Sequence, residues 1–413
     1  MEESGFGMDI VAEDRKSARK TVAAAILLVC FAVRIAWIVH SIGRPFYADE
    51  SIYDDIARNI LNGQGFSRGN PPHPSAFTMP IMPYLVAVVY ALSGYSVLAV
   101  RILLAALDTL TCFLLMSLGY SLFRRWRIAL LAGIIFSLHP LFIHLSSKLF
   151  SDTLLTLLIV SSLTSLLAAH RRDSVKLTAL SGLLMALSIL TRPTTVLLPA
   201  VVAGLLFCAR KPGRRWMPSI ASYLLIVFLL VIPWTIRNGL VFHRFIPLHT
   251  RGGENLYVGA GPGAHGETVT SVGTQGAPSE LAMRIRYLSE PAASDVLMKE
   301  ATKLIKNHPV HWMRLGVEKF LRLWFRLYRP RAKSLLGLIL FLANVVLLAA
   351  TFVGAKRSPD KLAGTLVFWI FGYFSFFHMV VCSELRYSAP AYAFFIPFAA
   401  AALLFKGATG DKT

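Results

Sequence analysis

About ten long apolar segments constrain this sequence more than any other feature. Each holds roughly 17 to 25 mainly apolar residues, enough for a helix to cross the hydrocarbon core of a membrane. The composition agrees, because 55% of the residues are hydrophobic and only 15% are charged. The sequence therefore predicts an all-α integral membrane protein with about ten transmembrane helices. The segments lie near residues 21–42, 97–121, 128–146, 152–169, 177–191, 194–209, 217–236, 334–355, 362–382 and 388–405.

The formal net charge of +20 does not indicate a nucleic-acid-binding protein. Such a function needs basic residues clustered on a soluble face, whereas here they separate the apolar segments. The four cysteines all fall inside apolar runs, and their spacing matches neither a metal site nor a disulfide framework. We expect Cys30, Cys112, Cys208 and Cys382 to be buried packing residues.

The basic residues predict the orientation of the chain, because short connections rich in Lys and Arg stay on the cytoplasmic side. With the N-terminus inside, the short outer connections contain only Lys148, Arg192 and Arg386. This orientation predicts a cytoplasmic tail over 1–20, a transmembrane domain over 21–405 and a second cytoplasmic tail over 406–413. Two long connections then lie outside. We call 43–96 the first outer region and 237–333 the second outer region.

Both outer regions are predicted to contain helices that lie along the membrane rather than cross it. In the first, a Pro-rich stretch precedes the short apolar run of "PPHPSAFTMPIMPYLVAVVYALSG", which is typical of a loop followed by an interfacial helix. The second contains the Gly-rich "GAGPGAHGETVTSVGTQGAP", which indicates a loop. After it, "HWMRLGVEKFLRLWFRLYRPR" combines aromatic and basic residues, as an amphipathic helix on an anionic membrane surface does.

Four carboxylates follow the first apolar segment, in "PFYADESIYDDIARNILNGQGFS". Isoleucines at 52, 56 and 60 predict a helix with one apolar face. Asp49 and Glu50, at its start, have an ordinary explanation, because acids cap helix N-termini and interact well with the helix dipole. Their position just outside the first span allows another. A carboxylate there can act as a base toward a hydroxyl, where a lipid head group meets a water-soluble partner.

A second acid, Asp152, opens the segment 152–169 on the same predicted side, and it too has capping as an alternative. The two carboxylates suggest one site. Other polar residues gather at the outer ends of spans, where they would form a partly cationic floor suited to a phosphate. Taken singly, they are also explained by snorkelling to the interface or by surface ion pairing. These residues are Arg192, Arg237, Asn238, Glu384, Arg386 and Tyr387.

His73, in the first outer region, is a further candidate for binding substrate or a metal. A lone loop histidine usually does neither. No cluster with metal-ligand spacing appears in the sequence, so the metal question stays open.

Several motifs occur in the order seen in the GT-C superfamily of polytopic membrane glycosyltransferases. The chain resembles most the bacterial branch related to protein O-mannosyltransferases and to the aminoarabinose transferase of lipid A. The resemblance covers about residues 40–395. The motifs are "ADESIYDDIARNILNGQGF", "MPYLVAVVYALSGYSVLAVRILLAALDTLTCFLL", "SDTLLTLL", "LTRPTTVLLP", "PWTIRNGLVFHRFIPLHTRGGENLYVGAGP" and "ELRYSAPAY".

This resemblance implies an inverting transfer of a monosaccharide from a polyprenyl-phosphate carrier to an acceptor hydroxyl. It also implies a bacterial inner (plasma) membrane protein whose active site faces the periplasm or cell exterior. Asp49 resembles the catalytic base and Glu50 its companion. Asp152 resembles a second acidic position that helps to hold a divalent metal in some branches and not in others, so no cofactor is certain. Substrate binding is implied for Tyr53, Arg237, Asn238, Glu384, Arg386 and Tyr387, with Arg192, Arg237 and Arg386 as candidates for the departing phosphate.

The resemblance leaves the sugar and the acceptor open, and the acceptor can be a lipid, a glycan or a protein. One departure bears on that choice, because the second outer region has no sizeable soluble domain to select a protein. A transporter or flippase of a lipid-linked or anionic substrate is the alternative function, and it requires ionisable residues at mid-membrane. Arg34, Arg101 and Asp108 are the candidates for that role, and packing between helices explains them equally.

Overall fold

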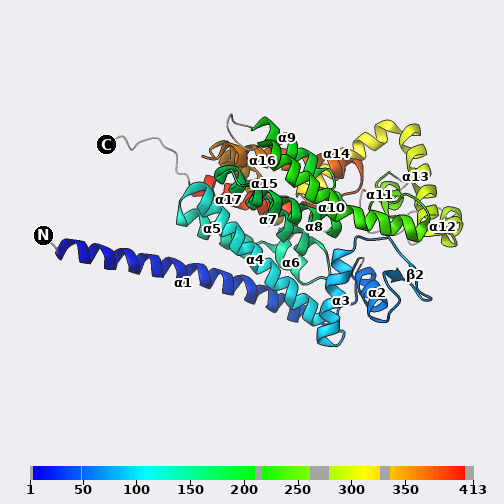
Figure 1. Ribbon diagram of the computed structural model, residues 1–413, viewed down its shortest axis with the longest axis horizontal. Coiled ribbons are helices and arrows are strands. Elements are labelled where there is room, and N and C mark those ends of the chain that lie inside the picture. The colour runs from blue at the N-terminus through cyan, green and yellow to red at the C-terminus, as the bar shows by residue number, and fades with distance from the viewer. Residues whose placement is uncertain (1–2, 48, 210–215, 261–278, 326–334, 405–413) are drawn as a thin grey trace.

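The computed structural model describes residues 3–47, 49–209, 216–260, 279–325 and 335–404, and these are almost entirely helical (Figure 1). This confirms the predicted all-α fold class. The predicted C-terminal tail, 406–413, and most of the Gly-rich stretch, 261–278, lie outside the described residues. The first nine helices are α1 (Glu3–His40), α2 (Asp49–Leu61), α3 (Ile81–Ser93), α4 (Val97–Phe123), α5 (Trp126–Leu138), α6 (Pro140–Ser146), α7 (Asp152–Arg172), α8 (Val175–Thr191) and α9 (Leu198–Cys208).

The second half of the chain continues in the same way. Its helices are α10 (Trp216–Phe242), α11 (Gly252–Ala260), α12 (Ser279–Arg286), α13 (Glu290–Asn307), α14 (Pro309–Phe325), α15 (Leu335–Lys356), α16 (Lys361–Val380) and α17 (Ala389–Leu404). Two 3-10 turns, η1 (Pro193–Thr195) and η3 (Leu385–Ser388), precede α9 and α17. Strands β1 (Ser67–Arg68) and β2 (His73–Pro74) pair antiparallel in the first outer region.

Each predicted span corresponds to one helix or, for 128–146, to a bent pair of helices, but the count of ten transmembrane helices is not confirmed. In the described part of the chain, six segments are long and apolar enough to cross a membrane: α1 from Ser17, α4, α7, α10, α16 and Leu385–Leu404. The pair α5 and α6 is a seventh candidate, bent by 58°. The remaining predicted spans correspond to the shorter apolar helices Val175–Thr191, Pro193–Cys208 and Phe341–Lys356.

Helix α17 forms the centre of the core, since every residue from Ala389 to Ala401 is buried. It contacts α5, α7 and α15. Gly354 of α15 allows the closest approach, because a Cβ there would clash with the carbonyl oxygen of Phe398. The cysteine prediction holds for Cys30, Cys112 and Cys382, which are buried, and is wrong for Cys208, which is exposed at the end of α9.

A buried ion pair joins α1 to α4. Arg34 Nε donates to Asp108 Oδ2, and both side chains are almost fully buried. Arg34 Nη1 also donates to the carbonyl oxygens of Cys30 at 2.9 Å and Ser137 at 3.3 Å. Both charges therefore have fixed partners between packed helices, as a structural pair requires.

The two outer regions meet at one end of the molecule, where Figure 1 shows α2, α3 and β2 beside α11, α12 and α13. Helix α3 confirms the helix predicted in the first outer region. Trp234 Nε1 and Asn238 Nδ2 of α10 both donate to the carbonyl oxygen of Leu248, at 2.7 and 3.1 Å. These bonds turn the chain back after α10, so that the second outer region returns toward the first.

Helix α14 departs in part from the expectation that its basic face lies on the membrane surface. Arg314 is exposed, and Arg326 and Arg329 lie outside the described residues. Lys319 and Arg322 are buried, and α14 packs against α16 and η3. Lys319 Nζ donates to the carbonyl oxygens of Met379 at 3.3 Å and Val380 at 3.4 Å, which end α16. Its own carbonyl oxygen accepts a hydrogen bond from Ser383 Oγ at 2.7 Å. Part of the basic face therefore fixes the segment that leads into η3, because it satisfies the free carbonyls at a helix C-terminus.

Candidate active site

Asp49 is the first residue of α2, and two arginines from distant parts of the chain contact it. Arg251 Nη1 donates to Asp49 Oδ1 at 2.7 Å, and Arg386 Nη1 lies 3.0 Å from Asp49 Oδ2. Arg251 immediately precedes α11, and Arg386 lies in η3. Only 6% of Asp49 is exposed, so both oxygens of a nearly buried carboxylate face cations.

Asp152, the first residue of α7, lies on the other side of Arg386. Arg386 Nη1 is 3.6 Å from Asp152 Oδ2, and Arg192 Nη1 donates to Asp152 Oδ1 at 2.5 Å. The guanidinium of Arg386 therefore lies between the two predicted acids. The sequence placed Asp49, Asp152, Arg192 and Arg386 in one site, and in the structure they form one connected group.

Aromatic rings and a third acid complete this group. Arg386 Nε donates to Glu384 Oε2 at 2.6 Å. The Arg192 guanidinium lies 4.1 Å from the centre of the Tyr387 ring, and that of Arg386 lies 4.4 Å from the Phe150 ring, distances at which cation–π attraction operates. We call the group the acid–arginine cluster. It consists of Asp49, Asp152, Glu384, Arg192, Arg251 and Arg386.

The arginines keep Asp49 ionised. Burial alone would raise the pKa of Asp49, but the charges of Arg386, Arg251 and Arg192 outweigh it and hold that pKa well below its usual value. The same attraction acts on Arg251. Burial alone would lower the pKa of Arg251, but the charges of Asp49 and Glu254 outweigh it and raise that pKa above its usual value. Three acids and three arginines balance in charge, which lets a buried group of ions exist.

Glu50 and Tyr53 lie beside the cluster in different roles. Glu50 is fully buried, and its carboxylate accepts hydrogen bonds from Tyr47 N at 3.1 Å and Leu149 N at 3.0 Å rather than contacting the arginines that bind Asp49. It therefore ties the start of α2 to the segment before α7. The Tyr53 hydroxyl donates to Ser151 Oγ at 3.2 Å, one residue before Asp152.

Arg237 and Asn238 lie outside the cluster and bind backbone instead. Arg237 donates to the carbonyl oxygens of Ser75 at 2.7 Å and Phe66 at 3.0 Å, and so holds the first outer region. Asn238 is buried and donates to Ile246 O and Leu248 O. Their contacts position the chain that carries Arg251, and a direct role at substrate stays a prediction for both.

Glu290, at the start of α13, joins the two outer regions. Its carboxylate accepts hydrogen bonds from Ser75 Oγ at 2.7 Å, Ala76 N at 3.0 Å and Thr250 Oγ1 at 3.0 Å. Thr250 also donates its backbone N–H to Ala76 O at 2.9 Å. Because Thr250 precedes Arg251, this junction places the Arg251 side chain against Asp49.

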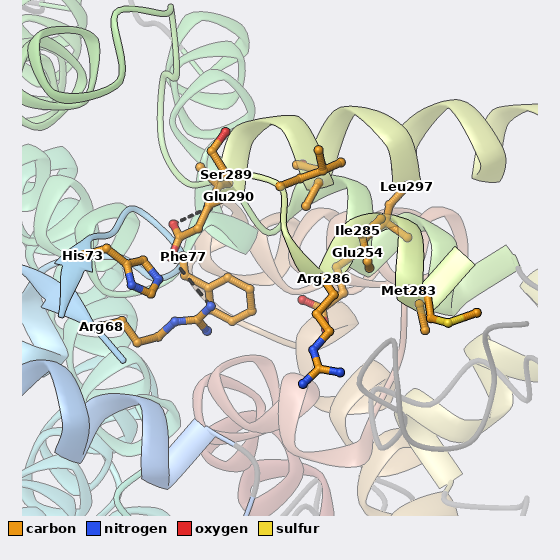
Figure 2. A pocket seen from close by; sticks show the side chains of 15 residues that line it. Arg68, His73, Phe77, Glu254, Met283, Ile285, Arg286, Ser289, Glu290 and Leu297 are labelled. Carbon is orange, nitrogen blue, oxygen red and sulfur yellow. Dashed lines mark hydrogen bonds and ion pairs between the residues drawn. The ribbon is translucent and has the colours of Figure 1, made fainter. Parts of the chain in front are cut away.

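A cavity of about 640 Å³ opens beside the cluster, between the first outer region and helices α11, α12 and α13. Figure 2 shows Arg68, His73 and Phe77 on one side of it and Met283, Ile285 and Arg286 on the other. His73 is exposed, and its ring Nδ1 lies 3.2 Å from Pro71 O. The sequence named His73 for substrate binding, and the structure places it in this cavity rather than beside Asp49.

Arg251 is the cluster residue that the sequence reasoning did not single out. It stands in "HTRGGENLY", a motif already noted, and is followed by two glycines. Position 253 requires glycine, because a Cβ there would clash with the carbonyl oxygen of Ser294. The sequence feature that could have identified Arg251 is its position directly before glycines, one of which lets α11 pack closely against α13.

The cluster does not fit a divalent metal as it stands. Metal ligands of this type are oxygen atoms converging on one point, whereas the guanidinium of Arg386 occupies the space between Asp49 and Asp152. Among the described residues, no group of three or more His, Cys, Asp or Glu side chains is placed to hold a metal ion.

Comparisons with known proteins agree with this architecture. Residues 72–236 match the family model described as dolichyl-phosphate-mannose-protein mannosyltransferase. A search of curated proteins gave no significant match. Among solved structures, the archaeal oligosaccharyltransferase AglB from Archaeoglobus fulgidus, in complex with an inhibitory peptide and a dolichol-phosphate, aligns with a TM-score of 0.58 and 13% identity. That alignment covers 94% of this chain and 50% of the other.

Two further structures are similar. The Archaeoglobus fulgidus oligosaccharyltransferase tethered to an acceptor peptide gives a TM-score of 0.56 at 12% identity, over 92% of this chain and 49% of that one. This chain thus spans about half the length of the oligosaccharyltransferases it matches. ArnT from Cupriavidus metallidurans bound to undecaprenyl phosphate gives 14% identity over 92% and 77%, with a TM-score of 0.45, too low for a shared fold to follow. In its fold and in the sequence of residues 72–236, the chain is similar to the GT-C superfamily of membrane glycosyltransferases, as its motifs predicted.

Proposed function

We propose that this protein is an inverting glycosyltransferase that moves a monosaccharide from a polyprenyl-phosphate carrier to an acceptor hydroxyl. The observation that carries the proposal is the carboxylate of Asp49, ionised and nearly buried, with the guanidinium groups of Arg251 and Arg386 against its two oxygens. A sugar transfer from a phosphate needs both kinds of group together. The carboxylate serves the incoming hydroxyl, and the cations serve the leaving phosphate.

In the proposed reaction, Asp49 accepts the proton of the acceptor hydroxyl as the hydroxyl oxygen bonds to the anomeric carbon. The bond from that carbon to the phosphate oxygen breaks, and its electron pair stays on the polyprenyl phosphate. Arg192, Arg251 and Arg386 stabilise the charge that develops there. By analogy with other preorganised donors, each key interaction contributes about 3 to 4 kcal/mol. Asp152 acts as a positioning residue, because it binds Arg192 and Arg386.

The cluster also explains how the base is controlled. A carboxylate paired with two arginines is a weak base. Arg251 has a second partner, Glu254, whose Oε2 lies 3.5 Å from Arg251 Nε. A donor phosphate that binds Arg251 and Arg386 removes part of their attraction for Asp49, and the basicity of Asp49 then rises as substrate binds.

This account predicts the pH dependence of an Arg251→Gln variant. Asp49 is active when ionised, so activity falls as pH drops through its pKa. An ordinary aspartate has a pKa of about 4. Because Arg251 helps to lower the pKa of Asp49, the acid limb of kcat/KM in the wild type lies below that pH. Without Arg251 the limb shifts to higher pH, and KM for the donor rises. Arg244, which is half exposed and pairs with exposed Asp295, provides the control variant Arg244→Gln. An unchanged acid limb in an Arg251→Gln protein as stable as that control would contradict the role of Arg251.

We further propose the membrane arrangement that the sequence predicted. The first and second outer regions, with the cluster between them, face the periplasm or cell exterior of a bacterial inner membrane, and both tails are cytoplasmic. Basic residues on the opposite connections support this orientation. A cysteine at exposed Gln64 should then react with a membrane-impermeant maleimide in intact cells.

A transporter requires movable charges at mid-membrane, whereas the candidate charges among the described residues have fixed partners. Arg34 and Asp108 bind each other, and Arg101 Nη2 lies 3.7 Å from Glu50. The deciding experiment uses the purified protein in nanodiscs with a panel of polyprenyl-phosphate hexoses and pentoses, and a membrane glycolipid extract as acceptor. Glycosyl transfer releases free polyprenyl phosphate from one of these donors. No release from any donor would leave the enzyme assignment without support.

A further inference from the structure

The cavity beside the cluster is built by both outer regions and has a defined lining. Its volume of about 640 Å³ lies within the range of ~300–1,000 Å³ typical of small-ligand sites. Glu290 forms part of its wall with a side chain that is only 8% exposed, and Glu290 holds Ser75, Ala76 and Thr250 in place. The wall is therefore fixed by hydrogen bonds between segments more than 200 residues apart.

Two lining residues connect this cavity to Asp49. Glu254 lines the cavity and pairs with Arg251, which in turn donates to Asp49. Phe77 also lines it, and its ring centre lies 5.0 Å from the Arg251 guanidinium. The Arg251 side chain therefore contacts both the wall of the cavity, through Glu254 and Phe77, and the proposed base.

The lining indicates the chemistry of the ligand. Two arginines, Arg68 and Arg286, and two carboxylates, Glu254 and Glu290, line the cavity, so its charges balance. Arg68 already has two partners: its guanidinium lies 4.0 Å from the centre of the Phe77 ring, and its Nη2 lies 3.7 Å from Glu290 Oε1. The remaining wall combines aliphatic side chains, among them Met283, Ile285 and Leu297, with the hydroxyl groups of Thr250, Ser289 and Ser294. Hydrogen-bond donors (the arginines) and acceptors (the carboxylates) suit the hydroxyl groups of a neutral sugar, and the apolar surface suits its C–H faces.

We propose that this cavity binds a neutral carbohydrate unit of the acceptor and directs one of its hydroxyl groups toward Asp49. The inference rests on the proposed function and adds the class of acceptor to it. A phosphorylated head group gains no net attraction from this lining, because the two carboxylates offset the two arginines. An extended peptide is recognised along a strand edge or groove, whereas this space is compact.

The test uses saturation-transfer NMR on the full chain in nanodiscs. The probes are the methyl glycosides of mannose, glucose and galactose, methyl glucoside 6-phosphate, and the tripeptide N-acetyl-Ala-Ser-Ala-amide. At least one neutral glycoside should bind more tightly than the phosphorylated sugar and the peptide. Ala293→Phe fills the cavity and should weaken that binding by about tenfold or more. Ala292→Phe is the matched control, since Ala292 is the neighbouring residue of α13 and does not line the cavity.

Two further comparisons make the result decisive. Ala282→Phe fills the cavity from α12 and replaces Ala293→Phe should that variant fail to fold. Arg286→Gln should weaken glycoside binding, whereas Arg284→Gln on the same helix should not. Unaltered binding in the filled variants, tighter binding of the phosphate or peptide probe, or no glycoside binding would overturn the inference.

The two proposals fail separately. Release of polyprenyl phosphate by the wild type tests the proposed function, whereas glycoside binding by the wild type tests the acceptor site. If the wild type releases nothing from any donor while glycosides still bind, the proposed function fails and the sugar site stands. If the wild type releases polyprenyl phosphate and no glycoside binds, the acceptor class is wrong and the enzyme assignment stands.

Discussion

Replacing Asp49 with asparagine is expected to lower the rate of sugar transfer by about 10²- to 10⁴-fold, the usual contribution of a positioned base. Asparagine has almost the same shape, and its oxygen still accepts a hydrogen bond from Arg251. It cannot take the proton of the acceptor hydroxyl. The measurement is the release of polyprenyl phosphate and glycosylated product by purified protein in nanodiscs.

Asp54→Asn is the matched control for this variant. Asp54 lies on the same helix, accepts a hydrogen bond from Tyr90 at 2.6 Å and pairs with the exposed Arg58, so its loss removes a carboxylate without touching the cluster. We expect near wild-type transfer there, because exposed ion pairs contribute little. Full activity in a folded Asp49→Asn protein would show that Asp49 is not the base.

Arg386→Gln should cause the second large loss, about 10²- to 10³-fold in kcat, equivalent to about 3 to 4 kcal/mol. Arg386 is the one described side chain that contacts Asp49, Asp152 and Glu384 together. Its removal takes away a cation for the leaving phosphate and leaves buried carboxylates less compensated, which also lowers stability. Arg386→Lys separates these effects. Lysine keeps the charge but cannot bridge three acids with a planar group, so its activity should stay low while part of the stability returns.

Arg244→Gln is the control for the arginine series, because Arg244 is half exposed and pairs with exposed Asp295. It should change transfer by less than about twofold. Circular dichroism and thermal unfolding of each protein establish that the variants are compared in the folded state. If the Arg386→Gln protein transfers sugar at the wild-type rate, Arg386 does not stabilise the leaving phosphate.

The sequence predicted the helical membrane fold because long apolar segments have few alternatives in a bilayer. It could not fix the number of spans. The chain bends by 58° between Leu138 and Pro140. In the described part of the chain, three other predicted spans, including α8 and α9, form apolar helices shorter than a full span, so an apolar stretch in the sequence does not fix where its helix ends. The basic face of α14 shows the same limit, since Lys319 faces the end of α16 rather than lipid head groups.

The acids of the site were predictable and the arginines were only partly so. Asp49 and Asp152 each begin a helix directly after a predicted outer connection, which is a local pattern. An arginine that meets a carboxylate looks the same in sequence as one that binds backbone. Arg237 donates to carbonyl oxygens of the first outer region, whereas Arg251 reaches Asp49 across 202 residues. Only the fold distinguishes them.

The stereochemistry of the product tests the central claim most directly. A carboxylate that acts as a base allows one displacement at the anomeric carbon, whereas a carboxylate that acts as a nucleophile gives two. Proton NMR of the product, formed from a donor of known anomeric configuration, distinguishes them. We expect the opposite configuration in the product. A product that retains the configuration of the donor would contradict the role of Asp49 as a base.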